Sequence, residues 1–180
     1  MKATIIGTGD IDIIRKNSKI GEKELEELLE RTAKLVANLG IEILILPARG
    51  IPYKFAQLYK KFGGKKVVGV IPSKCPFYGD YTEEIIGDYL DIIDERKEFD
   101  SWYDVDGNIA TLGDCTLCFG SSAGVIADRS EMKYNLKYKN KDTRLIIFEN
   151  TISRRLHKEV EASVRPIYIN SVPELEEELK

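Results

Sequence analysis

The segment CFGSSAGVIADRSEM, residues 118–132, places small residues directly before a predicted helix. We call the connection that follows a strand a joint. A joint without bulky side chains lets a ligand approach the backbone, and the following helix offers unpaired N–H groups and the positive end of its dipole. Serine hydroxyls at this joint can donate further hydrogen bonds. The preferred ligand is an anion such as phosphate. The residues predicted to bind it here are Gly120, Ser121, Ser122, Ala123, Gly124 and Val125.

Two further glycine-bearing joints follow the first and second predicted strands. The carboxyl ends of parallel strands meet at one edge of a sheet, so the three joints are expected to converge there. Gly7, Thr8, Gly9, Arg49 and Gly50 therefore complete the predicted phosphate- or nucleotide-binding set. Each joint taken alone can equally be a tight turn or a helix cap. The chain contains no GxGxxG and no GxxxxGK[ST], which disfavours a dinucleotide cofactor and an NTPase.

Two charged residues are candidates for catalysis beside these joints. Asp128 lies one helical turn beyond the last glycine of the third joint, and Arg96 follows the predicted fourth strand. A carboxylate facing a cationic, sugar-like transition state, with an arginine orienting the substrate, can support hydrolysis of an N-glycosidic bond. Lys97 and Glu131 are candidate substrate contacts. The alternative is that Asp128, Arg129 and Glu131 form a solvated helix face with i,i+3 pairs.

The elements that position these residues alternate between strand and helix. Predicted strands cover 3–7, 42–46, 66–71, 90–93, 114–119, 144–148 and 166–169, and predicted helices cover 21–39, 51–62, 83–90, 123–137, 151–162 and 173–180. Residues 72–81 are expected to form a loop, and 96–114 are unassigned except for a tight turn at Asp106–Gly107. The alternation predicts an α/β fold with a single doubly wound, mostly parallel sheet and helices on both faces. The chain is expected to form one domain, 1–180.

The composition excludes several functional classes. The chain has 180 residues, a net charge of −3 and a 32% share of charged residues, a composition that hints at a thermophilic source. The acidic pI of about 5.4 argues against nucleic acid as a partner, and no apolar run is long enough to span a membrane. Without a signal peptide, a cytoplasmic protein is expected.

The cysteines and the single histidine do not indicate a metal site. Cys115 and Cys118 form a CxxC, but they lie inside a predicted buried strand, and Cys75 leaves an odd number. We interpret them as buried small hydrophobic residues, without a disulfide framework, and expect neither a metal nor a cofactor. His157 lies in a charged stretch and is expected to be solvated.

Five stretches of the chain carry a family resemblance: GIPYKFAQLYKKFGGKKVVGVIP (50–72), DERK (94–97), GSSAGVIAD (120–128), RLIIFEN (144–150) and the C-terminal PIYINSVPELEEEL. Together they resemble a divergent member of the Rossmann-like superfamily that contains the Lonely Guy nucleotide phosphoribohydrolases (once labelled lysine decarboxylases), molybdenum-cofactor carrier proteins and DprA-type proteins. The resemblance implies a nucleotide phosphate over 120–125, a sugar near the catalytic pair Arg96 and Asp128, and a homodimer. Ser121, Ser122 and Val125 replace the family's two glycines and threonine, Asp128 replaces a glutamate, and an insertion occupies 98–113.

Two functions follow from these patterns. The first is binding of a nucleotide or another phosphate-bearing small molecule, with hydrolysis of the N-glycosidic bond of a nucleoside 5′-monophosphate. The second is a non-catalytic carrier or sensor of a nucleotide or a pterin-type cofactor. A third, DprA-like binding of single-stranded DNA, is disfavoured because tracking a phosphate backbone needs clustered lysine and arginine.

Overall fold

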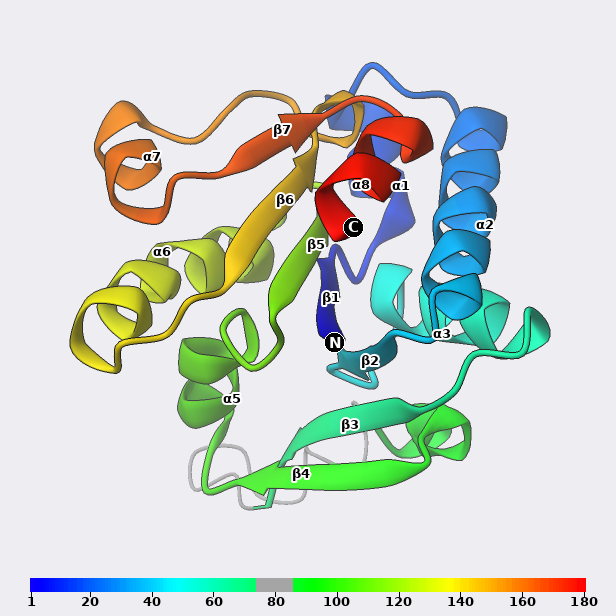
Figure 1. The fold of residues 1–180 in the computed structure, drawn as a ribbon, viewed down its shortest axis with the longest axis horizontal. Coiled ribbons are helices and arrows are strands. Elements are labelled where there is room, and N and C mark those ends of the chain that lie inside the picture. The colour runs from blue at the N-terminus through cyan, green and yellow to red at the C-terminus, as the bar shows by residue number, and fades with distance from the viewer. Residues whose placement is uncertain (74–85) are drawn as a thin grey trace.

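Seven strands form one parallel sheet in the computed structural model, which describes residues 1–73 and 86–180 (Figure 1). The strands are β1 (Lys2–Gly7), β2 (Glu42–Ile45), β3 (Val67–Pro72), β4 (Glu95–Phe99), β5 (Cys115–Phe119), β6 (Arg144–Phe148) and β7 (Ile167–Ile169). Their order across the sheet is β4-β3-β2-β1-β5-β6-β7, and each neighbouring pair is parallel. The predicted doubly wound α/β fold is confirmed.

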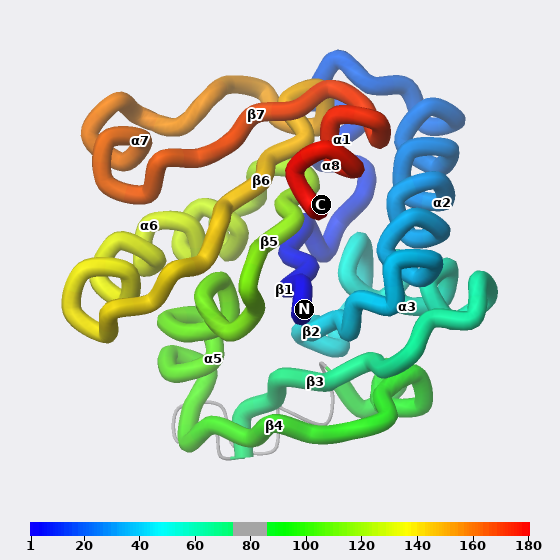
Figure 2. Tube along the Cα trace, viewed as in Figure 1, coloured from blue at the N-terminus to red at the C-terminus, as the bar shows by residue number. Residues whose placement is uncertain are grey.

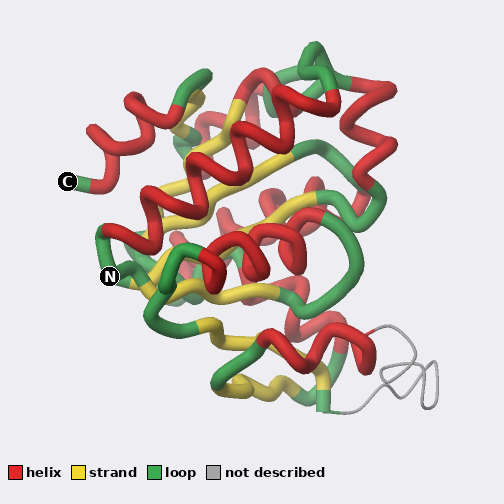
Figure 3. The backbone as a smooth tube through the Cα atoms, turned by 90° about the vertical axis from the view of Figure 1, so that its right-hand side faces the viewer, coloured by secondary structure: helices red, strands yellow, loops and turns green. Residues whose placement is uncertain are grey.

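The helices form two layers, one on each face of the sheet (Figures 1 and 3). One layer contains α1 (Ile11–Asn17), α2 (Glu22–Asn38), α3 (Ile51–Lys61) and α8 (Val172–Leu179), and the other contains α5 (Trp102–Ile109), α6 (Ala123–Tyr138) and α7 (Lys158–Val164). Two short 3₁₀ helices, η1 (Gly87–Ile92) and η2 (Glu149–Thr151), lie in the connections. The trace in Figure 2 shows β1 in the middle of the molecule, between the two layers.

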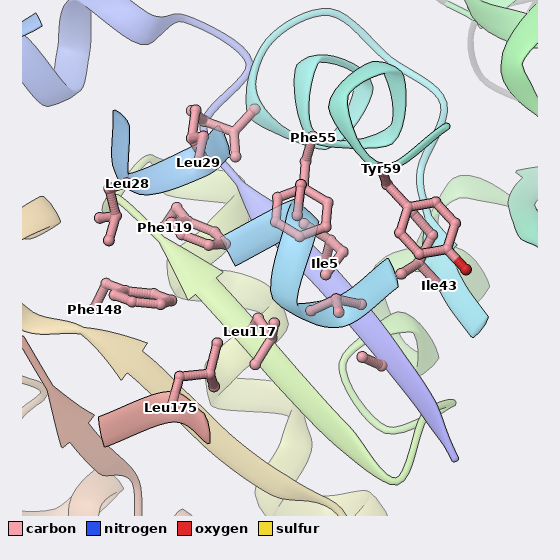
Figure 4. Close-up of a cluster of buried hydrophobic side chains, with 14 of the residues drawn as sticks. Ile5, Leu28, Leu29, Ile43, Phe55, Tyr59, Leu117, Phe119, Phe148 and Leu175 are labelled. Carbon is pink, nitrogen blue, oxygen red and sulfur yellow. The ribbon is translucent and has the colours of Figure 1, made fainter. Parts of the chain in front are cut away.

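The central strands are apolar throughout because both of their faces are covered. Ile5 belongs to the core cluster under α2 and α3, whereas its neighbour Ile6 belongs to the cluster under α6 and α7. This two-residue alternation is the ordinary geometry of a strand. Figure 4 shows the larger cluster, in which the rings of Phe119 and Phe148 stack with centroids 4.7 Å apart. The packing fixes the carboxyl ends of β5 and β6 relative to each other.

The fourth strand differs from its predicted position. The apolar run 90–93 forms the end of η1 and its following residue rather than a strand, and Ile92 and Ile93 pack against the core. The strand comes afterwards, at β4, whose residues Glu95–Glu98 are all exposed. An edge strand that is open to solvent need not be apolar, so the apolar run 90–93 was wrongly predicted to be the strand. Consequently Arg96 and Lys97 lie within a strand and not in a loop beyond one.

Three other assignments also differ or fall outside the described residues. The predicted helix 151–162 is replaced by η2 and the shorter α7, because the Thr151 hydroxyl accepts from the Gly120 amide and the Leu156 amide donates to the Tyr168 hydroxyl. Helix α1 was not predicted, and its N-cap is Asp10, which accepts from the Asp12 amide at 3.0 Å. Most of the predicted loop 72–81, with Cys75, and the start of the predicted helix 83–90 lie outside the described residues.

The expected turn at Asp106–Gly107 is instead part of α5. Ser101 caps this helix by accepting from the Asp104 amide at 3.2 Å, and Val105 and Ile109 pack against β2 and β3. The apolar spacing of the two buried residues therefore outweighs the turn preference of the Asp-Gly pair.

Replacement of Gly107 by alanine is expected to stabilise the protein by about 0.5–1 kcal/mol, because glycine is a poor residue in a helix interior. A Cβ built at this position meets no atom within 4 Å, so no clash opposes the gain. Urea denaturation of wild type and Gly107→Ala measures the difference. A loss of stability would contradict the helical assignment.

Candidate functional site

The order of the strands reverses between β1 and β5, which creates a switch point at their carboxyl ends. Gly7 at the end of β1 is paired with Phe119 at the end of β5. The Thr8 amide donates to the Phe119 carbonyl at 3.3 Å, so the connections that follow these two strands begin side by side. The first and third predicted joints are therefore brought together.

The joints after β1 and β2 pack backbone against backbone. Gly50 has a φ of 102°, and a Cβ on it would lie 2.4 Å from the Thr8 carbonyl oxygen. The Ile51 amide donates to that same oxygen at 3.0 Å. A Cβ on Gly9 would lie 3.3 Å from the Arg49 carbonyl oxygen. These contacts bring together Gly7, Thr8, Gly9, Arg49 and Gly50. The close packing of the two backbones explains why glycine is needed at positions 9 and 50, without invoking a ligand.

The hydroxyl of Thr8 is used within the joint itself. It donates to the Asp10 carbonyl at 3.0 Å and accepts from the Asp10 amide at 3.3 Å, and the residue is fully buried. Thr8 therefore shapes the connection that leads into α1. The third joint, between β5 and α6, also has exposed residues at the switch point.

At the third joint, the chain passes from β5 into α6 through Gly120, which has a φ of 85°. The Gly120 amide donates to the Thr151 hydroxyl at 3.0 Å, and Ser122 caps α6 by accepting from the Val125 amide at 3.4 Å. Ala123 and Gly124 are exposed, and a Cβ on Gly124 would meet nothing within 4 Å. As first-turn residues they have no helical acceptor for their amides, and no described residue accepts from them, so the start of α6 offers donors to a ligand.

Arg129 is the unexpected residue at this joint. It is only 1% exposed, which rules out for this residue the alternative of a solvated helix face that the sequence left open. Its Nε donates to the Val125 carbonyl at 3.1 Å and its Nη2 to the Ser121 hydroxyl at 3.2 Å. Its Nη1 is buried and has no hydrogen-bond partner in residues 1–73 and 86–180, and no carboxylate of these residues lies within 4.0 Å of the guanidinium.

The sequence did contain a signal for this burial. Val125, Arg129, Met132 and Leu136 follow one another at spacings of four, three and four residues, which is the stripe of a helix that faces a core. Val125 and Met132 belong to the core cluster on that face, and Leu136 packs against it. Arg129 thus occupies a core position, with its charged end directed back to Ser121 at the start of the helix.

Asp128, the next residue along α6, is half-buried and faces α5. The pKa of its carboxyl group is raised to about 8: burial is the largest cause, Asp106 on α5 raises the pKa as well, and the neighbouring Arg129 lowers it. Burial also raises the pKa of Asp106. At neutral pH the Asp128 side chain is therefore mostly a neutral acid that can donate a proton.

The raised pKa makes stability depend on pH. Aspartate ionises near pH 4 in an unfolded chain, whereas folded Asp128 keeps its proton to about pH 8, so the free energy of unfolding falls as the pH rises between these values. We expect Asp128→Asn to exceed wild type in stability by about 1–3 kcal/mol near pH 8 and to match it near pH 4. Urea denaturation across this range measures the gap. Asp142→Asn, at an exposed site, is the control. A gap that does not change with pH would contradict the assigned pKa.

Arg96 and Lys97 are placed away from Asp128. Arg96 is paired with Gly69 and Lys97 with Val70, both on β3. Strands β3, β2 and β1 separate β4 from β5, which leads into Asp128. At about 4.8 Å per strand, this separation is roughly 19 Å. The sequence predicts Arg96 in a joint after a strand at 90–93 and an approach to Asp128 from there; in the structure Arg96 lies within β4, and the strand order puts β4 four positions from β5. Glu131 is exposed on α6.

The two described cysteines are buried on β5, as expected. Cys115 belongs to the core cluster on one face of the sheet and Cys118 to the cluster on the other, because residues three apart in a strand point to opposite faces. Burial raises the pKa of each thiol to about 11. The CxxC spacing therefore does not form a reactive pair.

Two observations of absence apply to residues 1–73 and 86–180. These residues contain no cluster of three or more His, Cys, Asp or Glu side chains arranged to hold a metal ion. None of their helices is long and apolar enough to cross a membrane.

Comparison with solved structures identifies the class of fold to which this switch point belongs. The molybdenum cofactor carrier protein of Chlamydomonas reinhardtii is similar over 99% of this chain and 96% of its own, with a TM-score of 0.63 and 15% identity. The molybdenum cofactor binding protein of Rippkaea orientalis is similar over 99% and 95%, with a TM-score of 0.65 and 17% identity.

The DNA processing protein DprA of Streptococcus pneumoniae is similar over 97% of this chain and 60% of its own, with a TM-score of 0.56 and 13% identity. No protein-family model matches the chain, and no curated protein sequence matches it. The chain has the Rossmann-like fold that these proteins share.

Proposed function

We propose that this chain binds a small phosphate-bearing ligand, of nucleotide or pterin-cofactor type, with its phosphate over the start of α6. The observation that carries the proposal is the buried guanidinium of Arg129, which touches the Ser121 hydroxyl and keeps Nη1 unpartnered among the described residues. Burying a cation without a counter-charge is costly. An oxyanion near Ser121 would supply that charge, and the free amides of the first turn would bind it as well.

The ionisation of Asp128 supports the same conclusion. A neighbouring carboxylate is the usual counter-charge of a buried arginine, but the pKa of Asp128 is raised to about 8 and the group is mostly neutral at pH 7. The positive charge of Arg129 therefore remains uncompensated by this neighbour. An anionic ligand would complete the pair, and its negative charge would further favour the protonated form of Asp128.

The function that the geometry favours is that of a carrier or sensor, which binds its ligand without changing it. Two structural neighbours are named for carrying or binding the molybdenum cofactor. The separation of Arg96 from Asp128 across the sheet also favours a carrier or sensor over a hydrolase in which both residues act on the same glycosidic bond. The anion-binding features at the start of α6 suit any ligand that ends in a phosphate.

The second candidate is hydrolysis of the N-glycosidic bond of a nucleoside 5′-monophosphate. The raised pKa of Asp128 favours it, because a carboxylic acid that is protonated near neutral pH can donate a proton to a leaving base. In this version Asp128 acts as a general acid, and Ser121 and Arg129 hold the phosphate.

Incubation with a panel of nucleoside 5′-monophosphates separates the two candidates. Calorimetry measures binding, and chromatography measures release of free base and ribose 5-phosphate. Binding without release, retained in Asp128→Asn and weakened in Ser121→Ala, would support the carrier, and Ser153→Ala at an exposed site is the matched control. Release that disappears in Asp128→Asn would support the enzyme. If neither the nucleotides nor inorganic phosphate binds, the proposal is wrong.

A further inference from the structure

The C-terminal half of α6 and the end of α7 enclose a groove of about 510 Å³, which is within the size range of small-molecule sites. Helices α6 and α7 pack against each other on the same flank of the sheet (Figures 1 and 2). Lys133, at the near end of the groove, is ten residues from the start of α6, so about 15 Å separates the groove from the site proposed above.

Two tyrosines on α6 form an exposed aromatic surface in this groove. Tyr134 is 48% exposed and Tyr138 is 71% exposed. Their rings are close to parallel, at 14°, with centroids 6.4 Å apart. Exposed aromatic rings held in parallel offer a flat surface on which a planar ring can stack.

Three cations surround the tyrosines without carboxylate partners. Lys133 Nζ lies 4.7 Å from the Tyr134 ring centroid, Lys137 Nζ lies 5.1 Å from that of Tyr138, and Arg165 closes the groove from α7. In the part of the chain that the structure describes, no carboxylate forms an ion pair with any of the three. The groove is therefore positively charged although the whole chain carries a net charge of −3.

Arg165, which lines the groove, has a strained backbone conformation. It ends α7 in the left-handed region, with a φ of 47°, where a residue other than glycine is uncommon. Such strain costs about 1 kcal/mol or more and concentrates at functional sites. A glycine here would remove the strain, but it would also remove the third cation of the groove.

We propose that this groove is a second binding site, which takes a planar base through the tyrosine pair and its phosphate through Lys133, Lys137 and Arg165. The ligand chemistry is that of a nucleotide, either free or as a unit of a single strand. Stacking on an aromatic ring with neighbouring cations for the phosphate is the general mode by which bases and phosphates are bound together. This inference does not depend on the site at the start of α6.

The test compares free AMP, by calorimetry, with a labelled short oligothymidylate, by fluorescence anisotropy. We expect Tyr138→Ala and Lys137→Gln each to weaken binding of at least one of these probes by about tenfold, since stacking of one base contributes about 1–3 kcal/mol. Tyr138→Phe keeps the ring and should keep most of the affinity. Lys23→Gln, at a 90% exposed lysine on α2, is the matched charge control. Binding of AMP alone would identify free nucleotide as the ligand, and tighter binding of the oligonucleotide that falls steeply with salt would identify a strand.

The groove variants and the Arg129 variants report on separate sites. Loss of binding in Tyr138→Ala but not in Arg129→Met supports the groove even if the proposed function fails, and the reverse result overturns the groove alone. If wild type, Tyr138→Ala and Lys137→Gln bind AMP equally well and also bind the oligothymidylate equally well, the proposed groove site is wrong. Sedimentation gives a further check: if Tyr138→Ala changes the oligomeric mass and leaves binding unchanged, the groove is a subunit contact and the proposal is wrong.

Discussion

Arg129→Met is expected to weaken phosphate binding strongly and to leave the ligand-free protein at least as stable as wild type. The variant removes a buried cation that has no counter-charge among the described residues, and it places an apolar chain of similar length in a core position. Replacing buried ionic groups by apolar ones is often neutral or stabilising, and we expect a change between zero and about +1 kcal/mol. Loss of a charge-assisted contact should weaken binding of inorganic phosphate or AMP by at least about tenfold.

Thermal unfolding with and without ligand measures both effects in one experiment. Wild type should gain stability as the ligand concentration rises, and Arg129→Met should not. Arg154→Met, which removes an arginine at an exposed position, is the control and should behave as wild type. If Arg129→Met instead lost several kcal/mol and still bound the ligand normally, Arg129 would be a structural residue only.

Gly50→Ala is the substitution expected to damage the fold most. The new Cβ would lie 2.4 Å from the Thr8 carbonyl oxygen and 2.5 Å from the Gly9 Cα, and both are backbone atoms that cannot rotate away. The residue would also have to hold a φ of 102°. Together these effects should cost about 3–5 kcal/mol and separate the joints after β1 and β2. The free energy of unfolding in urea measures the loss.

Gly63→Ala separates the two causes of that loss. Gly63 also has a positive φ, 76°, but a Cβ on it would meet nothing within 4 Å. It should therefore cost only about 1 kcal/mol, from backbone strain alone. Equal losses in the two variants would mean that the contact between the joints is looser than the structure indicates.

The parts of the fold that the sequence predicted correctly are those in which burial leaves a local pattern. Strand β5 is apolar on both faces, and so it is recognisable without any tertiary information. Strand β4 is exposed along most of its length and carries four consecutive charged residues, Glu95–Glu98, so nothing local distinguishes it from a loop. Helix α5 was missed for a different reason, since it contains an Asp-Gly pair that is typical of turns.

The candidate site was likewise predictable only where the sequence carries a local pattern. The bare joint at the start of α6 follows from small residues between a strand and a helix, and the structure has that geometry. The burial of Arg129 was not anticipated because its neighbours in the chain are polar, and only the spacing from Val125 to Leu136 indicates it. The raised pKa of Asp128 comes first from burial and then from the charge of Asp106, which lies on another helix 22 residues earlier, and neither tertiary effect can be derived from one sequence.

The charged edge of the sheet has a consequence for behaviour at high concentration. Strand β4 ends the sheet on one side, and an unprotected edge of this kind can add a strand from another molecule and begin aggregation. Arg96, Lys97 and their acidic neighbours place charges of both signs along this edge, and burying them against a second molecule would be unfavourable. At the opposite margin β7 has only three residues, which is too short to template much growth. The charges at one margin and the short strand at the other therefore disfavour addition of a further strand at either edge of the sheet.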